Sequence, residues 1–375
     1  MFPESDVREG SEYVFRQFQR RDVDSYLSLY ETIWGTRHEP EWVTWRFCEN
    51  PYVDHVPVFV AVSDGDVVAT RPFFVLRMRV GDRETLALLT VDTMVHPDHR
   101  RRGLFTTLSE KAIEWYASKA PSFVFNQPTT EARAGFTKLG WRELTPSVNY
   151  HRVQRPGTLM RNHVDGGQQL PRQFPPVMTS LAGLVLDVAD VLRSGDGDAV
   201  RERPDVQPET LSSLYQRRQP DLVHAVRDEA YYRWRFASPA WNRQTYLTDA
   251  GGETVGALVR TRTTHEDVTV TQLADIVPMR GGEGWETAVA SLLSRTIEDH
   301  RGSDVLSIPE GILPPSVLLR LGFLPDDRPP LSLLSQNDSV LSVRPLADDG
   351  GEQLDRDRLL DSDGWLLGYG ERDTV

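Results

Sequence analysis

The stretch Val95-His96-Pro97-Asp98-His99-Arg100-Arg101-Arg102-Gly103-Leu104-Phe105 decides the fold, because it separates a predicted strand from a predicted helix. Residues 86–95 are rich in Leu, Val and Thr, which is typical of a buried strand. After the turn, apolar residues recur at helical spacing as far as residue 116. The turn therefore opens a helix, whose free N–H groups and positive dipole end suit a diphosphate. The arginines add paired donors, and Gly103 lets a phosphate approach the backbone.

The Arg-x-x-Gly-x-(small) arrangement at residues 100–105 resembles the cofactor motif of the GNAT superfamily of acyl-CoA N-acyltransferases. Phe105 departs from the Gly or Ala that most members carry there. The surroundings are similar to the family pattern: a hairpin over residues 58–80, a short strand at 122–125, and a helix at 129–139 that ends in Gly140-Trp141. The resemblance covers residues 11–150 and implies an α/β (α+β) fold, with a mixed central sheet flanked by helices.

The resemblance also implies that acetyl-CoA is the acyl donor and that a continuous set of residues binds it. This set is Met94, Val95, Arg100, Arg101, Arg102, Gly103, Leu104, Phe105 and Thr106. The thioester carbonyl would lie near the backbone N–H of Val95. A run of arginines also suits nucleic acid, but a net charge of -13 and a pI near 5.2 give no general attraction for phosphate backbones.

Acyl transfer to an amine requires a base for the amine and a proton for the leaving thiolate. Asp92 and His96 are the candidate bases, with a chain of water molecules as the alternative. For the acid, many family members use a Tyr where this chain has Phe136, which has no proton to donate. We therefore expect Thr129 or Thr130 to relay a proton through water, or the terminal carboxylate of Val375 to reach the site.

The chain also contains an internal repeat. Trp45-Arg46-Phe47 recurs 189 positions later as Trp234-Arg235-Phe236, and Leu139-Gly140-Trp141 recurs 182 positions later as Leu321-Gly322-Phe323. Agreement in order and spacing predicts two tandem GNAT-like domains. Tandem GNAT proteins are a known arrangement in the superfamily.

The second copy lacks the basic turn. In its place stands Pro278-Met279-Arg280-Gly281-Gly282-Glu283, where Glu283 would repel a diphosphate. We expect a degenerate, non-catalytic domain that helps to wall the acceptor pocket, or else a purely structural duplication.

The predicted domain boundaries follow from the repeat and from composition. An acetyltransferase domain with the acyl-CoA site covers residues 11–153, and a linker with a packing helix at 177–192 covers 154–207. The degenerate domain covers 208–335. An acidic tail at 336–375 is expected to dock on one lobe through Trp365-Leu366-Leu367 and Tyr369.

Length and composition set broader limits. The 375 residues suffice for two cores, and no apolar run approaches the roughly 18 residues that span a bilayer. The N-terminus lacks a signal peptide pattern, so we expect a cytoplasmic protein without membrane contacts. Cys48 is the single cysteine, and no metal ligands accompany His96 and His99 at suitable spacing. Abundant Asp and Arg with three lysines suggest a halophilic archaeon, although a GC-rich genome also favours Arg.

Together these features predict an N-acetyltransferase that transfers acetyl from acetyl-CoA directly to a primary amine of a small molecule or peptide. Two alternatives stay open: a non-catalytic acyl-CoA-binding module, and an aminoacyl transferase of the peptide-bridge type. The sequence predicts no nucleic-acid partner, and it leaves open the acceptor and whether the chain forms an oligomer.

Overall fold

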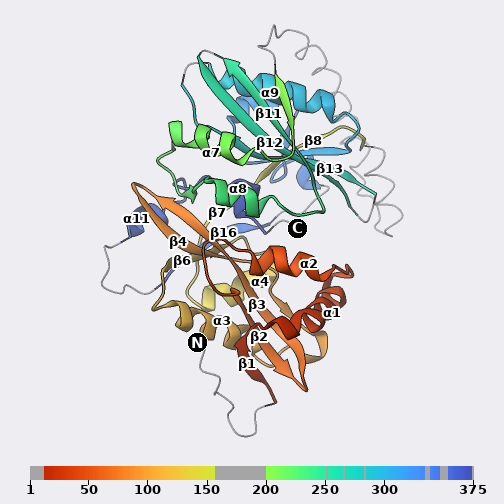
Figure 1. Ribbon diagram of the computed structural model, residues 1–375, viewed down its shortest axis with the longest axis vertical. Coiled ribbons are helices and arrows are strands. Elements are labelled where there is room, and N and C mark those ends of the chain that lie inside the picture. The colour runs from red at the N-terminus through yellow and green to blue at the C-terminus, as the bar shows by residue number, and fades with distance from the viewer. Residues whose placement is uncertain are drawn as a thin grey trace.

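The computed structural model describes residues 12–156, 200–250, 252–264, 267–282, 284–333, 338–346 and 354–373. Two mixed β-sheets, each flanked by helices, build the fold (Figure 1). One continuous core of buried side chains extends over both sheets. The predicted mixed α/β class is confirmed. The expected helix at 177–192 lies outside the described residues.

The first sheet has the strand order β1-β2-β3-β4-β6-β16-β7, and β5 and β10 also pair with β3. Its strands are β1 (Val14–Gln17), β2 (Val58–Ser63), β3 (Asp66–Val80), β4 (Arg83–Thr90), β5 (Met94–Val95), β6 (Pro121–Asn126), β7 (Arg142–Pro146), β10 (His224–Ala225) and β16 (Val340–Pro345). Its helices are α1 (Val23–Trp34), α2 (Pro40–Val43), a π-helix (Thr44–Cys48), α3 (Leu104–Tyr116) and α4 (Thr130–Lys138).

The long strand β3 has one face in each of two cores, because side chains alternate along a strand. Phe73 and Val75 pack with α3, whereas Phe74 and Leu76 belong to the core shared with the second sheet. Helix α3 covers the first face through Leu104 and three further apolar side chains at helical spacing. The sheet thus has α3 on one side, and on the other side α1, α2 and the π-helix together with the second half of the chain.

The second sheet has the order β15-β8-β14-β13-β12-β11-β9. Its strands are β8 (Asn149–Val153), β9 (Arg201–Pro204), β11 (Asn242–Ala250), β12 (Glu253–Thr263), β13 (Thr269–Val277), β14 (Val305–Pro309) and β15 (Leu324–Pro325). The helices of this half are α7 (Pro208–Arg217), α8 (Glu229–Arg235), α9 (Trp285–Asp299) and α10 (Pro315–Arg320), and the short α11 (Arg356–Leu359) follows in the tail.

Each sheet takes one inner strand from the other half of the chain. Strand β16 lies between β6 and β7, where Val343 pairs with both Phe125 and Arg142. Strand β8 lies between β14 and β15, where His151 pairs with both Ser307 and Leu324. The sequence led us to expect domain boundaries at residues 153 and 336. The sheets do not divide there, because β8 and β16 each belong to the sheet of the other half. Periodicity identifies a strand, but it does not say in which sheet, or between which neighbours, the strand lies.

The repeated Trp-Arg-Phe segments meet where the two halves contact each other. The indole N–H of Trp45 donates to the carbonyl of Trp234 at 2.7 Å, and that of Trp234 donates to the carbonyl of Trp45 at 3.0 Å. Both side chains are buried. This reciprocal pair fixes the two repeats against each other.

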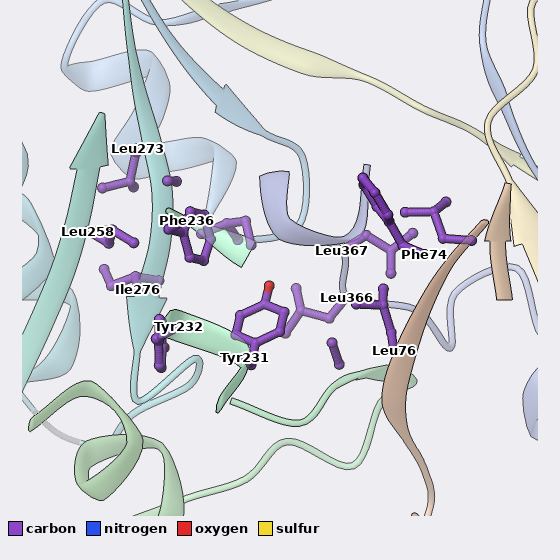
Figure 2. Packing of buried hydrophobic residues seen from close by; sticks show 14 of the residues in the cluster. Phe74, Leu76, Tyr231, Tyr232, Phe236, Leu258, Leu273, Ile276, Leu366 and Leu367 are labelled. Atoms are coloured by element: carbon purple, nitrogen blue, oxygen red, sulfur yellow. The ribbon is translucent and has the colours of Figure 1, made fainter. Parts of the chain in front are cut away.

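The end of the chain passes between the two sheets, where the C-terminal label lies in Figure 1. Figure 2 shows Leu366 and Leu367 between Tyr231 of α8 and the β3 side chains Phe74 and Leu76. The backbone N–H of Leu366 also donates to the carbonyl of Val223 at 2.9 Å. No helix in the described ranges is long and apolar enough to cross a membrane.

The strand exchange predicts that the first half does not fold alone. A fragment of residues 1–153 lacks β16, so the edges of β6 and β7 that β16 covers would expose unpaired backbone groups. We expect no cooperative urea transition for this fragment by circular dichroism. Co-expression with residues 200–375 should yield a soluble complex, and a cooperative transition of the isolated fragment would contradict the exchange.

Candidate functional site

The turn before α3 forms a cradle of backbone and arginine groups. Strand β5 ends at Val95, a 3-10 turn covers Pro97–His99, and α3 starts directly after Gly103. Arg101 and Gly103 have positive φ angles of 63° and 79°. A Cβ atom on Gly103 would meet no atom within 4 Å, so open space lies beside this backbone. The first-turn N–H groups of α3 therefore face a region that a phosphate can reach.

A hollow of about 460 Å³ adjoins the cradle. Most of the predicted donor-binding residues line it: Met94, Val95, Arg100, Arg101, Gly103, Leu104 and Phe105, together with Ile33, Thr93 and His99. The exposed Thr106 lies on the first turn of α3 outside this lining.

Arg102 also turns away from the hollow. Its Nη1 donates to Glu12 Oε1 at 2.7 Å and to Tyr13 Oη at 2.8 Å, and Tyr13 in turn bonds His99 Nδ1 at 2.9 Å. These contacts tie the turn to the segment before β1. Of the three arginines, Arg100 and Arg101 are therefore placed to meet a ligand in the hollow.

A second polar group lies at the start of the segment that leads to the cradle. Asp92 is buried, has a positive φ of 37°, and precedes Thr93 and Met94 of the hollow. Arg46 Nε donates to Asp92 Oδ2 at 2.6 Å, and Arg46 Nη2 donates to Asp373 Oδ1 at 2.7 Å. The backbone N–H of Asp92 donates to Asp373 Oδ2 at 2.9 Å. We call these three side chains the Asp92–Arg46–Asp373 cluster.

Burial dominates the electrostatics of this cluster. It raises the pKa of Asp92 to about 7; the negative charge of Asp373 adds to the rise and Arg46 opposes it. Two carboxylates share one guanidinium. If the two carboxylates hold one proton near neutral pH, the cluster carries no net charge. The side chain of Asp373 is 36% exposed, which gives this otherwise buried group access to solvent.

Arg46 and Asp373 were not predicted as site residues. Arg46 belongs to the repeated Trp-Arg-Phe segment. Because the arginine recurs between two aromatic residues in both copies, it could have been recognised as a buried charge. No local pattern marks Asp373, because its partner Asp92 is 281 positions away. The expected terminal carboxylate of Val375 lies outside the described residues.

His96 and Thr129, the other predicted catalytic residues, do not line the hollow. His96 Nδ1 accepts the N–H of Asp98 at 3.3 Å and so stabilises its own turn. Thr129 is exposed at the N-cap position of α4, and its side chain makes no capping hydrogen bond. Asp338 instead accepts the N–H of Thr130 at 3.2 Å.

Phe136 is buried and packs edge-to-face against Phe105, with 5.4 Å between the ring centroids. Its ring also contacts Trp141, with 5.4 Å between the ring centroids. The aromatic residue that stands where a family Tyr would be is therefore part of a packed wall beside the hollow.

The turn of the second half is filled by protein. A Cβ atom on Gly281 would overlap the Trp285 ring, whose indole N–H donates to the carbonyl of Pro278 at 2.9 Å. Arg280 is engaged by carbonyls, at 2.7 Å from Gly311 O and 3.2 Å from Ile312 O. Glu283 lies outside the described residues. An indole and a bonded arginine thus occupy the place of the basic cradle.

Comparisons with known proteins bear on the fold. Residues 14–143 match the family model of the acetyltransferase (GNAT) domain. No curated protein matches the chain. Among solved structures, the chain is similar to a GCN5-related N-acetyltransferase from Anabaena variabilis, with a TM-score of 0.54 and 11% identity over 89% of this chain and 73% of that one. A GCN5-related N-acetyltransferase from Kribbella flavida gives a TM-score of 0.52 and 13% identity over 89% and 72%. The chain therefore carries a segment that matches the GNAT acetyltransferase domain and has the fold of GCN5-related N-acetyltransferases.

Proposed function

We propose that this protein is an N-acetyltransferase that transfers an acetyl group from acetyl-CoA directly to a primary amine of a small molecule or peptide. The observation that carries the proposal is the cradle before α3, which opens onto a hollow within the segment that matches the GNAT domain model. When bound, acetyl-CoA supplies an activated thioester. The chain's own part is to hold the donor, orient the amine and move protons.

The residues present fit such a donor. Arg100 and Arg101 line the hollow beside the open backbone at Gly103, so they can meet the diphosphate together with the first-turn N–H groups of α3. Arg102 braces the turn from outside, through Glu12 and Tyr13.

We assign the general base to Asp92. A carboxylate with a pKa of about 7 can accept a proton from an amine near neutral pH, unlike an ordinary aspartate. Arg46 and Asp373 hold its position, and the partly exposed Asp373 favours a cationic acceptor. His96 stays an alternative base.

Thr129 remains the candidate for the proton that the leaving thiolate needs, although it is exposed on α4. If Thr129 relays this proton, Thr129→Val should lower turnover per folded molecule about tenfold or more. Unchanged turnover would assign the proton transfer to another group or to water.

The second half, in this proposal, binds no donor and shapes the acceptor site. Arg262 of β12 lies over the ring of Trp241, with 4.6 Å between its guanidinium carbon and the ring centroid. Arg235 donates to the carbonyls of Gly370 at 2.9 Å and Arg372 at 2.7 Å, and thereby holds the tail that presents Asp373.

The decisive experiment mixes the purified protein with acetyl-CoA and a panel of amines, and follows free thiol and the acetylated product by mass spectrometry. We expect amine-dependent thiol release. Binding of acetyl-CoA without turnover on any amine would favour the binding module, and no binding would favour the aminoacyl transferase.

The cradle makes a quantitative prediction. Arg100→Ala combined with Arg101→Ala should weaken acetyl-CoA binding by about 2 to 4 kcal/mol, because each arginine makes charge-assisted hydrogen bonds. Arg280→Ala is the matched control and should change the affinity less than threefold. Calorimetry measures both variants, and unchanged affinity in the double variant would refute the donor assignment.

The base makes a prediction about pH. Asp92→Asn should lower turnover at least about 100-fold with little change in acetyl-CoA binding, since general bases contribute 10²–10⁴-fold. The wild-type rate should rise with pH through about 7, where Asp92 loses its proton. Asp373→Asn should move this midpoint to lower pH, because it removes a neighbouring negative charge. Asp275→Asn, a matched change in the second half, is the control and should not move this midpoint.

Stability gives an independent readout for Asp92. Its folded pKa is raised, so its contribution is fully present below its unfolded pKa and is lost as pH rises through about 7. The melting temperature of Asp92→Asn relative to wild type should therefore increase from pH 5 to pH 8. A constant difference over this range would argue against the raised pKa.

A further inference from the structure

Arg71 of β3 is a charged side chain that the proposed chemistry does not use. It is 1% exposed and lies on the face of the sheet that α3 covers. Four aromatic rings surround its guanidinium carbon, with centroids at 5.4 Å (Phe73), 5.5 Å (Phe105), 5.0 Å (Phe136) and 5.9 Å (Trp141).

The guanidinium is only partly satisfied by protein groups. Its Nη1 donates to Thr93 Oγ1 at 2.7 Å, while Nε and Nη2 are buried and have no hydrogen-bond partner in the described part of the chain. Burial lowers the pKa of Arg71 to about 9. Arg46 and Arg227, by contrast, are each paired with two carboxylates.

An unpaired buried charge is costly, and proteins keep one mainly where function requires it. Cation–π contacts with the rings offset a part of this cost. The unused N–H groups could donate to an anionic oxygen, which would add charge-assisted hydrogen bonds and neutralise the cation.

Arg71 lies directly behind the wall of the hollow. Two of its contacts, Thr93 and Phe105, line the hollow that the cradle opens onto. Phe105 is half-buried and occupies the position where the sequence departs from the small residue of the family pattern. The ring of Phe105 therefore both lines the hollow and contacts the guanidinium.

We propose that Arg71 is an anion-binding residue of the donor site, which receives an anionic oxygen of the thioester donor when the Phe105 ring moves aside. This inference rests on the proposed function. The oxygen has two sources, a phosphate of the coenzyme or a carboxylate on the acyl chain. The phosphate is favoured, because Arg71 and the N-terminus of α3 lie on the same face of the sheet.

Calorimetry with three donors tests the proposal: acetyl-CoA, succinyl-CoA and the phosphate-free acetyl-pantetheine. Arg71→Met should weaken acetyl-CoA binding at least tenfold and leave acetyl-pantetheine unchanged. A loss confined to succinyl-CoA would identify the acyl carboxylate as the anion. Equal affinities of wild type and Arg71→Met for all three donors would overturn the proposal while leaving the proposed function intact, whereas a wild type that binds none would overturn both.

Three further variants separate ligand binding from structure. Arg152→Met removes a buried arginine of the second sheet and should not change donor affinity. Arg71→Lys should recover part of the acetyl-CoA affinity, because it keeps the charge. Phe105→Ala should strengthen acetyl-CoA binding in the wild-type background and have no such effect in Arg71→Met.

The melting temperature without donor completes the test. Replacing an unpaired buried cation by an apolar chain of similar length is neutral or stabilising, so Arg71→Met should not melt earlier than wild type. If Arg71 served only to brace the aromatic rings, this variant would melt earlier with unchanged donor affinity per folded molecule, and the proposal would fail.

Discussion

The guanidinium of Arg46 is removed from water, and two carboxylates from segments far apart in the chain balance its charge. One is Asp92, at the start of the segment that leads to the cradle, and the other is Asp373, in the tail. The contact with Asp373 is possible only because the tail passes between the two sheets. Two further features hold the tail in this place. Leu366 and Leu367 are buried, and Arg235 donates hydrogen bonds to the tail backbone.

The repeated Trp-Arg-Phe segments have taken complementary parts in this arrangement. Their tryptophans bond each other's backbones, which sets the distance between the halves. Their arginines both hold the tail, Arg46 through the carboxylate of Asp373 and Arg235 through carbonyls. Of the two, only Arg46 also contacts the carboxylate that we assign as the base. Both copies of the Trp-Arg-Phe pattern thus support a single polar site.

Local patterns predicted the features that depend on neighbouring residues. The turn with Gly103 and the helix after it are set by periodicity and by backbone preference, and the structure has both. The strand expected over residues 86–95 is divided: β4 ends at Thr90 and β5 covers Met94–Val95, with Asp92 at a positive φ between them. The direction of the Arg102 side chain was not predictable, because it depends on Glu12 and Tyr13 in the segment before β1. The same holds for Asp373, whose role depends on a fold that joins distant parts of the chain. Burial, which raises the pKa of Asp92 and isolates Arg71, is likewise a property of packing.

The exchanged strands have a consequence for how the chain acquires its structure during synthesis. The gap between β6 and β7 is filled by residues 340–345, so the first sheet cannot be completed until synthesis has passed residue 345. Until then the N-terminal half carries open strand edges, which are prone to pair with other chains. A product truncated before residue 340 would be left with an unfinished sheet.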